Sequence, residues 1–340
     1  MKSGLTVAKS VAVTIVLMLP AAMPALAQDA EWQVPRTAWG TPDFEGVWSN
    51  ETLTPFERPV GQAEKQFVTP EEAAAAAARI QALFARDAKA GVPKTEPPRQ
   101  GGNVGAYNIG WMDFGSSVVS TRRASLVIDP PDGRVPVRPA AEARRDEARR
   151  RNTETYEYMS PWDRCITRGM PGGMFPAGYN NYYRFLQATP DTLVILYEMI
   201  HEARIIPLDG RARLGAPSWN GEPRGHWEGD TLVVETSGYI DGGWIATSGS
   251  QGRIKGIHHT SQLRVVERFN RVDEDTIMWQ ATIEDPEIYT SQWTVEIPLV
   301  SRRGSKIYEY ACHEGNQAVG NILRGARVQE ADAEGTPTGN

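Results

Sequence analysis

The stretch TPDTLVILYEMIHEARIIPLDG, residues 189–210, decides the fold of the second half of this chain. Four ionisable side chains interrupt its apolar residues: Glu198, His201, Glu202 and Arg204. Such groups cost free energy to bury unless they are paired. In one continuous strand Glu198 and Arg204 would lie about 20 Å apart, whereas a hairpin that turns at Ile200 and His201 makes them cross-strand neighbours able to pair. We therefore expect a hairpin, although the turn lacks the Gly or Asn that tight hairpins favour.

The turn that opens this stretch recurs further along the chain. An acidic turn ending in Asp-Thr leads into a β-branched and aromatic run in TPDTLVILYE, EGDTLVVETS and DEDTIMWQAT. Strand-like runs precede them (YYRFLQA, RGHW and LRVVERFNRV), and QWTVEIPLV with KIYEYACHE makes a fourth pair. About four successive hairpins without a crossover helix predict an antiparallel meander. Closing into a barrel hides its edges, and about eight strands leave room for side chains or one small ligand.

The first 27 residues have the composition of a secretory signal peptide. Two lysines precede an apolar run, and Ala25-Leu26-Ala27 is a small-residue cleavage site. A membrane anchor is the open alternative, although the apolar run from Val11 to Leu19 is short for a bilayer span. We expect a periplasmic or secreted protein with no membrane span after cleavage.

Charge and cysteine content narrow the function classes. Removing Lys2 and Lys9 with the signal peptide takes the formal net charge from -6 to -8, which disfavours nucleic acid as a partner. In an oxidising compartment, the two cysteines Cys165 and Cys312 are expected to form one disulfide. A catalytic cysteine is the less favoured alternative.

Two helices are expected ahead of the meander. In TPEEAAAAAARIQALFARDAKAG, Thr69 is a natural N-cap, Pro70 suits the first helical position and Gly91 ends the helix. The second, AAEARRDEARRRN, is charged all round and is expected on the surface. Residues 92–138 are otherwise loop-like. The chain therefore divides into a signal peptide at 1–27, an N-terminal segment with the first barrel strand at 28–60, a helical and loop insertion at 61–180, the β-meander barrel at 181–327 and a disordered tail at 328–340.

Two resemblances support this mainly β, lipocalin-like meander barrel with an α-helical insertion. Gly46 and Trp48 in EGVW resemble the Gly-x-Trp first strand of lipocalins and related calycins, in which the Trp closes one end of the barrel. The insertion departs from a plain lipocalin and would pack outside the barrel or cap its mouth. DPPDGR, EARIIPLDGR, GHWEGDTLVVET, LRVVERFNRVDEDTI and YEYACHEGN together resemble a family of largely uncharacterised secreted bacterial proteins over most of residues 38–327. That resemblance implies export and a β-rich fold and assigns no catalytic residues.

Alternation along the strands indicates which polar groups face the interior. Glu267 shares the apolar phase of LRVVERF, and Trp279 and Trp293 share the apolar phases of TIMWQATI and WTVEI. In the last predicted strand, Glu309 and His313 share the phase of Ile307 and Ala311. The opposite phase, with Tyr308, Tyr310 and Cys312, is nearly as apolar and stays open.

Local ligand and cofactor motifs are absent. HEARI and HEGNQ begin like a zincin motif, but Ile205 and Gln317 stand where the second His is needed. A metal site assembled across strands from His201, His226, His258 and His313 stays open, although we expect no metal. Because no phosphate loop, nucleophile elbow or dinucleotide fingerprint is present, we expect no cofactor.

These patterns predict a binding cavity in the barrel. Ten Trp and eleven Tyr against eight Phe suit a small hydrophobic or aromatic, partly polar molecule as the partner. The candidate catalytic residues are His201, His313, Glu267, Glu309, Tyr308 and Arg204. The candidate ligand-binding residues are Glu198, Trp227, Trp279, Trp293, Tyr179 and Asn181. A disulfide would fasten the loop RCITRGMPGGMFPAGYNNYY, with Arg164, Arg168 and Asn180 as further hydrogen-bonding groups, beside His313.

Two functions are compatible with such a cavity. The first is a cofactor-independent lyase or isomerase acting by acid/base chemistry on an aromatic or terpenoid compound. The alternative is a non-catalytic, lipocalin-like carrier of a hydrophobic molecule. Inward carboxylates and histidines favour the enzyme, because a carrier of lipids gains nothing from buried charge.

Overall fold

The computed structural model describes residue 1, residues 32–89 and residues 112–335. The chain forms two units, Met1–Gln33 and Val34–Asn340, and the second contains the whole fold described below. The predicted signal peptide, apart from Met1, and the predicted helix end at Gly91 lie outside the described residues. Among the helices of the described residues, none combines the length and the apolar character needed to span a bilayer.

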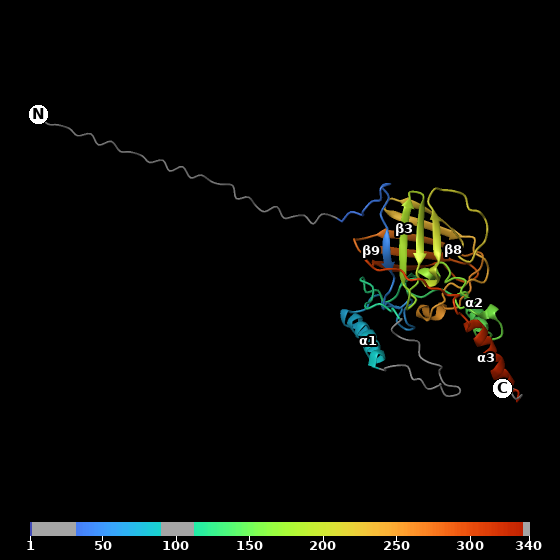
Figure 1. The fold of residues 1–340 in the computed structure, drawn as a ribbon. Helices are drawn as coiled ribbons and strands as arrows, with labels where there is room; N and C mark the ends of the chain where they lie inside the picture. Colours follow the sequence, from blue (N-terminus) through green and yellow to red (C-terminus); the bar gives the residue numbers. More distant parts are fainter. Residues whose placement is uncertain (2–31, 90–111, 336–340) are drawn as a thin grey trace. The chain divides into compact units, whose positions relative to one another are not determined.

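The second unit is mainly β and forms a nearly closed antiparallel barrel (Figure 1). Nine strands follow one another around the wall in the order β5-β4-β3-β1-β10-β9-β8-β7-β6. A tenth strand pairs with β10 outside this path. The strands are β1 (Gly46–Ser49), β2 (Val127–Asp129), β3 (Tyr182–Thr189), β4 (Thr192–Tyr197), β5 (Ala203–Pro207), β6 (Glu222–Glu228), β7 (Thr231–Ser237), β8 (Arg264–Arg271), β9 (Thr276–Glu284) and β10 (Trp293–Ser301), of which β2 is the one outside the path.

Side chains close the remaining seam between β5 and β6. A Cβ atom added to Gly225 on β6 would come within 2.6 Å of Leu208 and 3.0 Å of Ile206, so the two edges are packed against each other. The seam has no ladder hydrogen bonds between its two strands. Side-chain packing therefore continues all the way around the barrel, whereas the backbone hydrogen bonds are interrupted between β5 and β6.

The hairpin predicted for residues 189–210 is confirmed. β4 and β5 pair with Ile195 opposite Arg204, and the 3-10 helix η4 (Met199–His201) makes the turn. Ile200 and His201 adopt φ of 60° and 42°, so two residues other than Gly or Asn take the left-handed conformation that the turn requires. The predicted pairing of Glu198 with Arg204 is wrong, because Arg204 turns into the barrel and pairs with Glu267.

The fourth predicted hairpin is also wrong. The pairs β3–β4, β6–β7 and β8–β9 are present as expected, but residues 306–314 form no strand. β10 already pairs with β9 on one side and, on the other, with β1 and β2, so a further strand has no free edge beside it. As a consequence Glu309 and His313 are exposed and do not face the barrel interior.

Large apolar side chains fill the barrel interior. The predicted inward phases of β8, β9 and β10 are confirmed, and Trp279 and Trp293 are 0% exposed. The ring of Phe175 lies 6.1 Å from that of Trp279 and 6.3 Å from that of Trp293. Phe185 meets Phe269 edge to face at 5.9 Å. The sequence led us to expect a cavity inside the barrel. That expectation is wrong for the part of the interior around these rings, because the rings fill the space.

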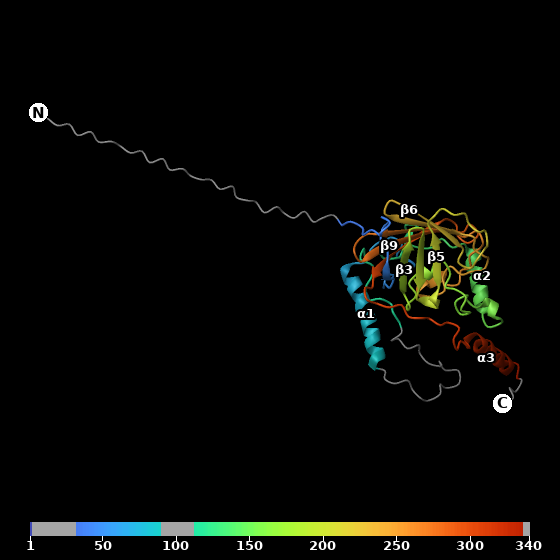
Figure 2. The ribbon, with the colours of Figure 1, turned by 45° about the horizontal axis from the view of Figure 1, so that its top comes forward.

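The three α-helices lie outside the barrel wall, toward one end of it (Figures 1 and 2). Thr69 caps α1 as predicted, with its hydroxyl accepting from Glu72 N and the Glu72 carboxylate accepting from Thr69 N. In the second helix, predicted to be charged and superficial, Arg145 is buried and donates to Arg253 O. The tail predicted to be disordered from residue 328 is helical to Ala333. Besides η4, the helices of the described residues are α1 (Pro70–Lys89), α2 (Pro139–Arg150), η2 (Tyr156–Tyr158), η3 (Gly172–Met174), η5 (Gly249–Ile254) and α3 (Ala318–Ala333).

Candidate functional site

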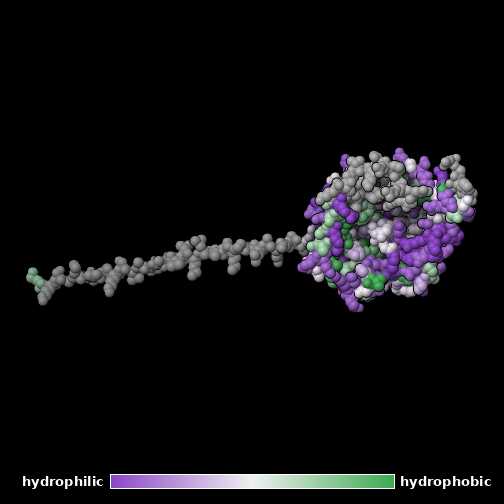
Figure 3. All heavy atoms as spheres, turned by 90° about the horizontal axis from the view of Figure 1, so that it is seen from below, coloured by the Kyte–Doolittle hydropathy of each residue, from purple (hydrophilic) through white to green (hydrophobic). Residues whose placement is uncertain are grey.

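An open pocket lies at the end of the barrel, bounded by the segment after β1, by α1 and by the loops around residues 176 and 250. Its cavity volume is about 420 Å³, a size that suits a small organic molecule. Most of its wall is apolar: Leu53, Phe56, Ile80, Phe114, Leu126 and Pro176. Figure 3 looks at the molecule from below and shows hydrophobic surface, in green, among hydrophilic residues.

Asp113 supplies the carboxyl group of this pocket. Its backbone is held on two sides, because Asp113 N donates to Gly178 O at 2.6 Å and Asn181 Nδ2 donates to Asp113 O at 2.7 Å. Asn181 is 2% exposed, and its Oδ1 accepts from Ala177 N at 3.0 Å. The predicted ligand-binding residue Asn181 therefore positions the loop that carries Asp113.

Gly115 lets the same loop approach the chain after β1 closely. It has φ of +77°, and a Cβ atom there would come within 2.9 Å of Thr52 N. Leu53 N donates to Ser117 O at 2.8 Å and Val119 N to Thr54 Oγ1 at 2.9 Å, which joins the two segments. A side chain at position 115 would push these segments apart and with them the wall of the pocket.

A second carboxyl group lies beside Asp113. Glu51 is within hydrogen-bond reach of the Asp113 carboxyl. Arg302 forms an ion pair with Glu51, and the Ser49 hydroxyl donates to it at 3.2 Å. Burial, and then the hydrogen bond and negative charge of Glu51, raise the pKa of Asp113 to about 7. At neutral pH the pair therefore holds a proton that it can give up or take back.

Substitution Asp113→Asn should make the stability of the protein less dependent on pH. The pKa of Asp113 rises from 3.8 to about 7 on folding, so the folded state keeps a proton that the unfolded state has lost. Stability then falls as the pH rises from about 4 to 7 and stays at the lower level above that range. The amide side chain of the variant does not ionise, so the variant should be more stable than the native protein at pH 8 and equal to it below pH 4.

Urea unfolding at several pH values measures this difference, and the variant Glu64→Gln, at an exposed position, is the control. Parallel pH profiles of the native and Asp113→Asn proteins would contradict it.

The structure places Arg204 and Glu267 together inside the barrel. Their side chains are 6% and 1% exposed and form a two-point ion pair, with Arg204 Nη1 2.9 Å from Glu267 Oε1. Thr236 accepts from Arg204 at 2.8 Å, and Trp279 Nε1 donates to Glu267 at 3.1 Å. These bonds use most of the polar atoms of the pair, so it serves to hold β5 to β8 and β9 in the packed interior.

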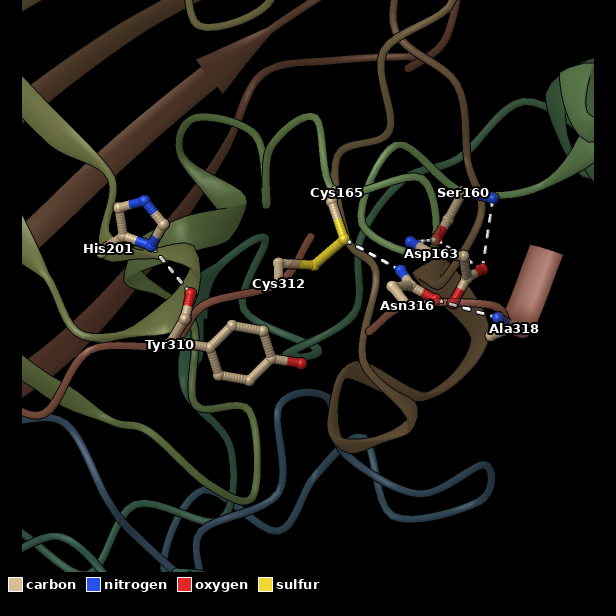
Figure 4. The surroundings of a disulfide bond; sticks show 8 residues. All are labelled: Ser160, Asp163, Cys165, His201, Tyr310, Cys312, Asn316 and Ala318. Carbon is tan, nitrogen blue, oxygen red and sulfur yellow. Dashed lines mark hydrogen bonds between the residues drawn. A yellow bond between two sulfur atoms is a disulfide. The ribbon is translucent and has the colours of Figure 1, made fainter. Parts of the chain in front are cut away.

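The other predicted catalytic residues lie on the surface. His201 is exposed, and its Nδ1 donates to Tyr310 O at 2.7 Å (Figure 4). Tyr308 is 71% exposed, and Glu309 and His313 are exposed as well. None of the six residues predicted to be catalytic lines the pocket of Asp113.

The predicted ligand-binding residues are also dispersed. Glu198 is 6% exposed and accepts from Tyr308 N at 3.2 Å. Trp227 packs edge to face on Phe44 at 5.4 Å, and Tyr179 lies 6.2 Å from Trp162. Together with the buried Trp279 and Trp293, they are part of the packing of the barrel and its loops.

The predicted disulfide between Cys165 and Cys312 is present and holds the C-terminal segment against the loop before β3. Figure 4 shows the surrounding contacts, in which Asn316 Nδ2 donates to the sulfur of Cys165 and Asp163 accepts from Ser160. The disulfide, the bond from Asn316 to Cys165 and the bond from His201 to Tyr310 tie residues 310–316 to the barrel end.

Metal ligands do not assemble in the described part of the chain. No three His, Cys, Asp or Glu side chains there are arranged to hold an ion. His226 lies exposed beside Glu228, whereas burial lowers the pKa of His258 to about 4 and also lowers the pKa of the buried His259. The cross-strand histidine site that the sequence left open is therefore not formed by the described residues.

Sequence reasoning missed the carboxyl group that lines the pocket and the one beside it. Glu51 and Asp113 lie in irregular segments, where strand or helix periodicity gives no information about which way a side chain points. The one local signal is the setting of Asp113 in WMDFG, where a single carboxylate stands among apolar residues. No protein-family model, curated protein or solved structure matches this chain.

Proposed function

We propose that this protein is an exported, cofactor-independent enzyme, a lyase or isomerase, that acts on a small aromatic or terpenoid molecule in the pocket of Asp113. The observation that carries the proposal is the carboxyl pair of Asp113 and Glu51 at an apolar pocket. An acid/base residue is most effective when its pKa lies near the working pH. The Asp113–Glu51 pair meets that requirement without a metal ion.

The proposed chemistry is a proton transfer by Asp113. Its ionised carboxylate takes a proton from a carbon of the substrate, and the C–H electron pair moves into a new double bond. In a lyase the C–O bond on the neighbouring carbon breaks with its electron pair going to oxygen, and the protonated Asp113 gives its proton to that oxygen. In an isomerase the existing double bond of the substrate breaks as the new one forms, and its electron pair takes the proton back from Asp113 at a different carbon. Glu51, which forms an ion pair with Arg302, raises the pKa of Asp113 and so keeps the Asp113 proton available at neutral pH.

Export fits the cysteine chemistry of the chain. The disulfide between Cys165 and Cys312 is typical of proteins in an oxidising compartment. The signal-peptide composition of residues 1–27 supports the periplasm or the exterior of the cell as the location.

The test is a search for turnover by the purified protein. A panel of aromatic dimers and terpenoids is incubated with it, and products are followed by mass spectrometry. For a converted compound, Asp113→Asn should lower kcat by at least about a hundredfold, because the proton carrier is lost. Glu64→Gln, at an exposed position outside the pocket, should leave kcat unchanged.

The variant Glu51→Gln tests whether Asp113 transfers the proton. It should shift the pH–rate profile, and no such shift is expected if Asp113 only supports the structure. Removing the negative neighbour lowers the pKa of Asp113, so the limb of the pH–rate profile that reports Asp113 should move to lower pH. Binding of panel compounds without conversion, at native affinity in Asp113→Asn, would instead support the alternative of a non-catalytic carrier.

A further inference from the structure

A second polar site lies in the loops beside the barrel, apart from the pocket of Asp113. A narrow crevice there is lined by Arg168, Thr247 and His259, together with Trp219, Trp244 and Gly243. Arg168 and Thr247 are 2% exposed and His259 is 1% exposed. Arg168 Nη1, Thr247 Oγ1 and His259 Nε2 all lack a hydrogen-bond partner within the described residues. Three unpartnered polar atoms around one crevice are unusual, because each costs free energy to bury.

Arg168 is the most unusual of the three. Its guanidinium carries a charge, yet it forms no ion pair with any carboxylate of the described residues. The nearby carboxylate of Glu202 is occupied by Thr167, at 2.7 Å, and by Asn220. The guanidinium lies over the Trp162 ring, 4.9 Å away, and it also interacts electrostatically with Tyr179, Tyr310 and Glu202. Its Nη1 nevertheless has no hydrogen-bond acceptor among the described residues, and a buried cationic donor of this kind favours an electron-rich oxygen at that place.

His259 supplies the complementary group. Its Nδ1 lies 3.3 Å from Thr260 O, and a carbonyl oxygen only accepts, so Nδ1 carries the proton and Nε2 is a free acceptor. Burial lowers the pKa of His259, which keeps the ring neutral. A Cβ atom on Gly243 would come within 2.1 Å of Nε2, so only glycine there leaves this nitrogen facing the crevice.

Tryptophan side chains surround the crevice on the solvent side. Trp219 and Trp244 line it, and Trp162 lies under Arg168; all three are partly exposed. Flat aromatic walls above a polar floor suit a planar ring that carries one polar substituent. The crevice is closed in this structure and leaves no room for a water molecule, so binding of a ring requires the partly exposed Trp219 and Trp244 to move outward.

We propose that this crevice binds the hydroxyl group of a small phenol. The phenol oxygen accepts from Arg168 Nη1, its proton is donated to His259 Nε2, and Thr247 Oγ1 completes the set. The ring lies between the tryptophans. This site uses neither Asp113 nor Glu51, so it stands or falls independently of the proposed enzyme activity.

The test uses 4-nitrophenol as the probe and nitrobenzene, which has the ring without the hydroxyl, as the control compound. Calorimetric titration of the purified protein should show saturable binding of 4-nitrophenol and none of nitrobenzene. Equal binding of both compounds, or no saturable binding of 4-nitrophenol, would overturn the proposal.

Variants assign the binding to this crevice. Arg168→Met should weaken 4-nitrophenol binding by about tenfold or more, since it removes a charged hydrogen bond. The same variant should unfold at an equal or higher urea concentration than the native protein, because an unpaired buried charge is gone. Arg184→Met, an exposed arginine on β3, is the matched control and should keep native affinity.

Thr247→Val and His259→Gln provide evidence if the arginine variant does not fold. Each should weaken binding of 4-nitrophenol while keeping the side-chain volume nearly constant. Binding that survives in these variants and in Arg168→Met, but is lost in Asp113→Asn, would place the probe in the open pocket and refute the crevice site.

Discussion

Replacing both Cys165 and Cys312 by serine should lower the free energy of unfolding by roughly 5 kcal/mol. The bond joins residues 147 positions apart, so it closes a large ring in the unfolded chain and removes much of that chain's conformational entropy. The ring spans all the wall strands from β3 to β10. Urea unfolding of the oxidised native protein and of the double variant measures the difference.

Two controls make this result specific to the covalent bond. The native protein kept in reductant should unfold at the same urea concentration as the double serine variant. Hydrogen exchange of residues 308–316 should also accelerate in the variant, because the contacts of Glu198 and His201 with this segment lose their anchor. A loss below about 1 kcal/mol would show that the segment is held without the bond.

Glu267→Ala should destabilise the protein by about 3–5 kcal/mol. The substitution leaves the guanidinium of Arg204 buried at 6% exposure, with the neutral hydroxyl groups of Thr236 and Tyr197 as hydrogen-bond partners and no carboxylate. An uncompensated buried charge costs far more than the attraction of an exposed ion pair contributes. The measurement is the unfolding free energy in urea, with Arg268→Ala, which breaks the exposed pair with Glu228, as the matched control.

A double substitution separates the cost of the isolated charge from the contribution of the pair. Arg204→Met with Glu267→Leu removes both charges and keeps apolar volume in the barrel. It should be less destabilised than Glu267→Ala alone, because no unpaired ion remains. If Glu267→Ala cost less than about 1 kcal/mol, water would have to reach Arg204, and the packed interior described above would be wrong.

The sequence predicts the parts of the fold that depend on neighbouring residues. Asp-Thr turns and the alternation of β8 and β9 identify the hairpins, because both signals arise within a few residues. The partner of β10 could not be predicted in this way. Residues 306–314 have an alternating apolar pattern in both phases, and only the pairing of β1 with β10 decides that they form no strand.

The candidate site depends even more on distant parts of the chain. Glu51 and Asp113 are brought together by Asn181, which comes from a third segment. No periodic pattern connects these three positions, so their meeting follows from tertiary packing alone. Glu267 was predicted to face inward and does, because its position on β8 is fixed by the alternation of a regular strand.

The position of β1 in the wall has a consequence for the order of events when the chain is synthesised. Its Trp48 pairs with Tyr183 on one side and with Ser301 on the other, so one four-residue strand joins the early and the late parts of the sequence. On a ribosome or a translocon, residue 48 appears long before residue 301. Contacts between such distant residues form slowly, because a large loop must close first. The barrel therefore closes late in folding, after the whole chain has been made. A truncated product that stops before β10 leaves the aromatic interior exposed to solvent, where it promotes aggregation.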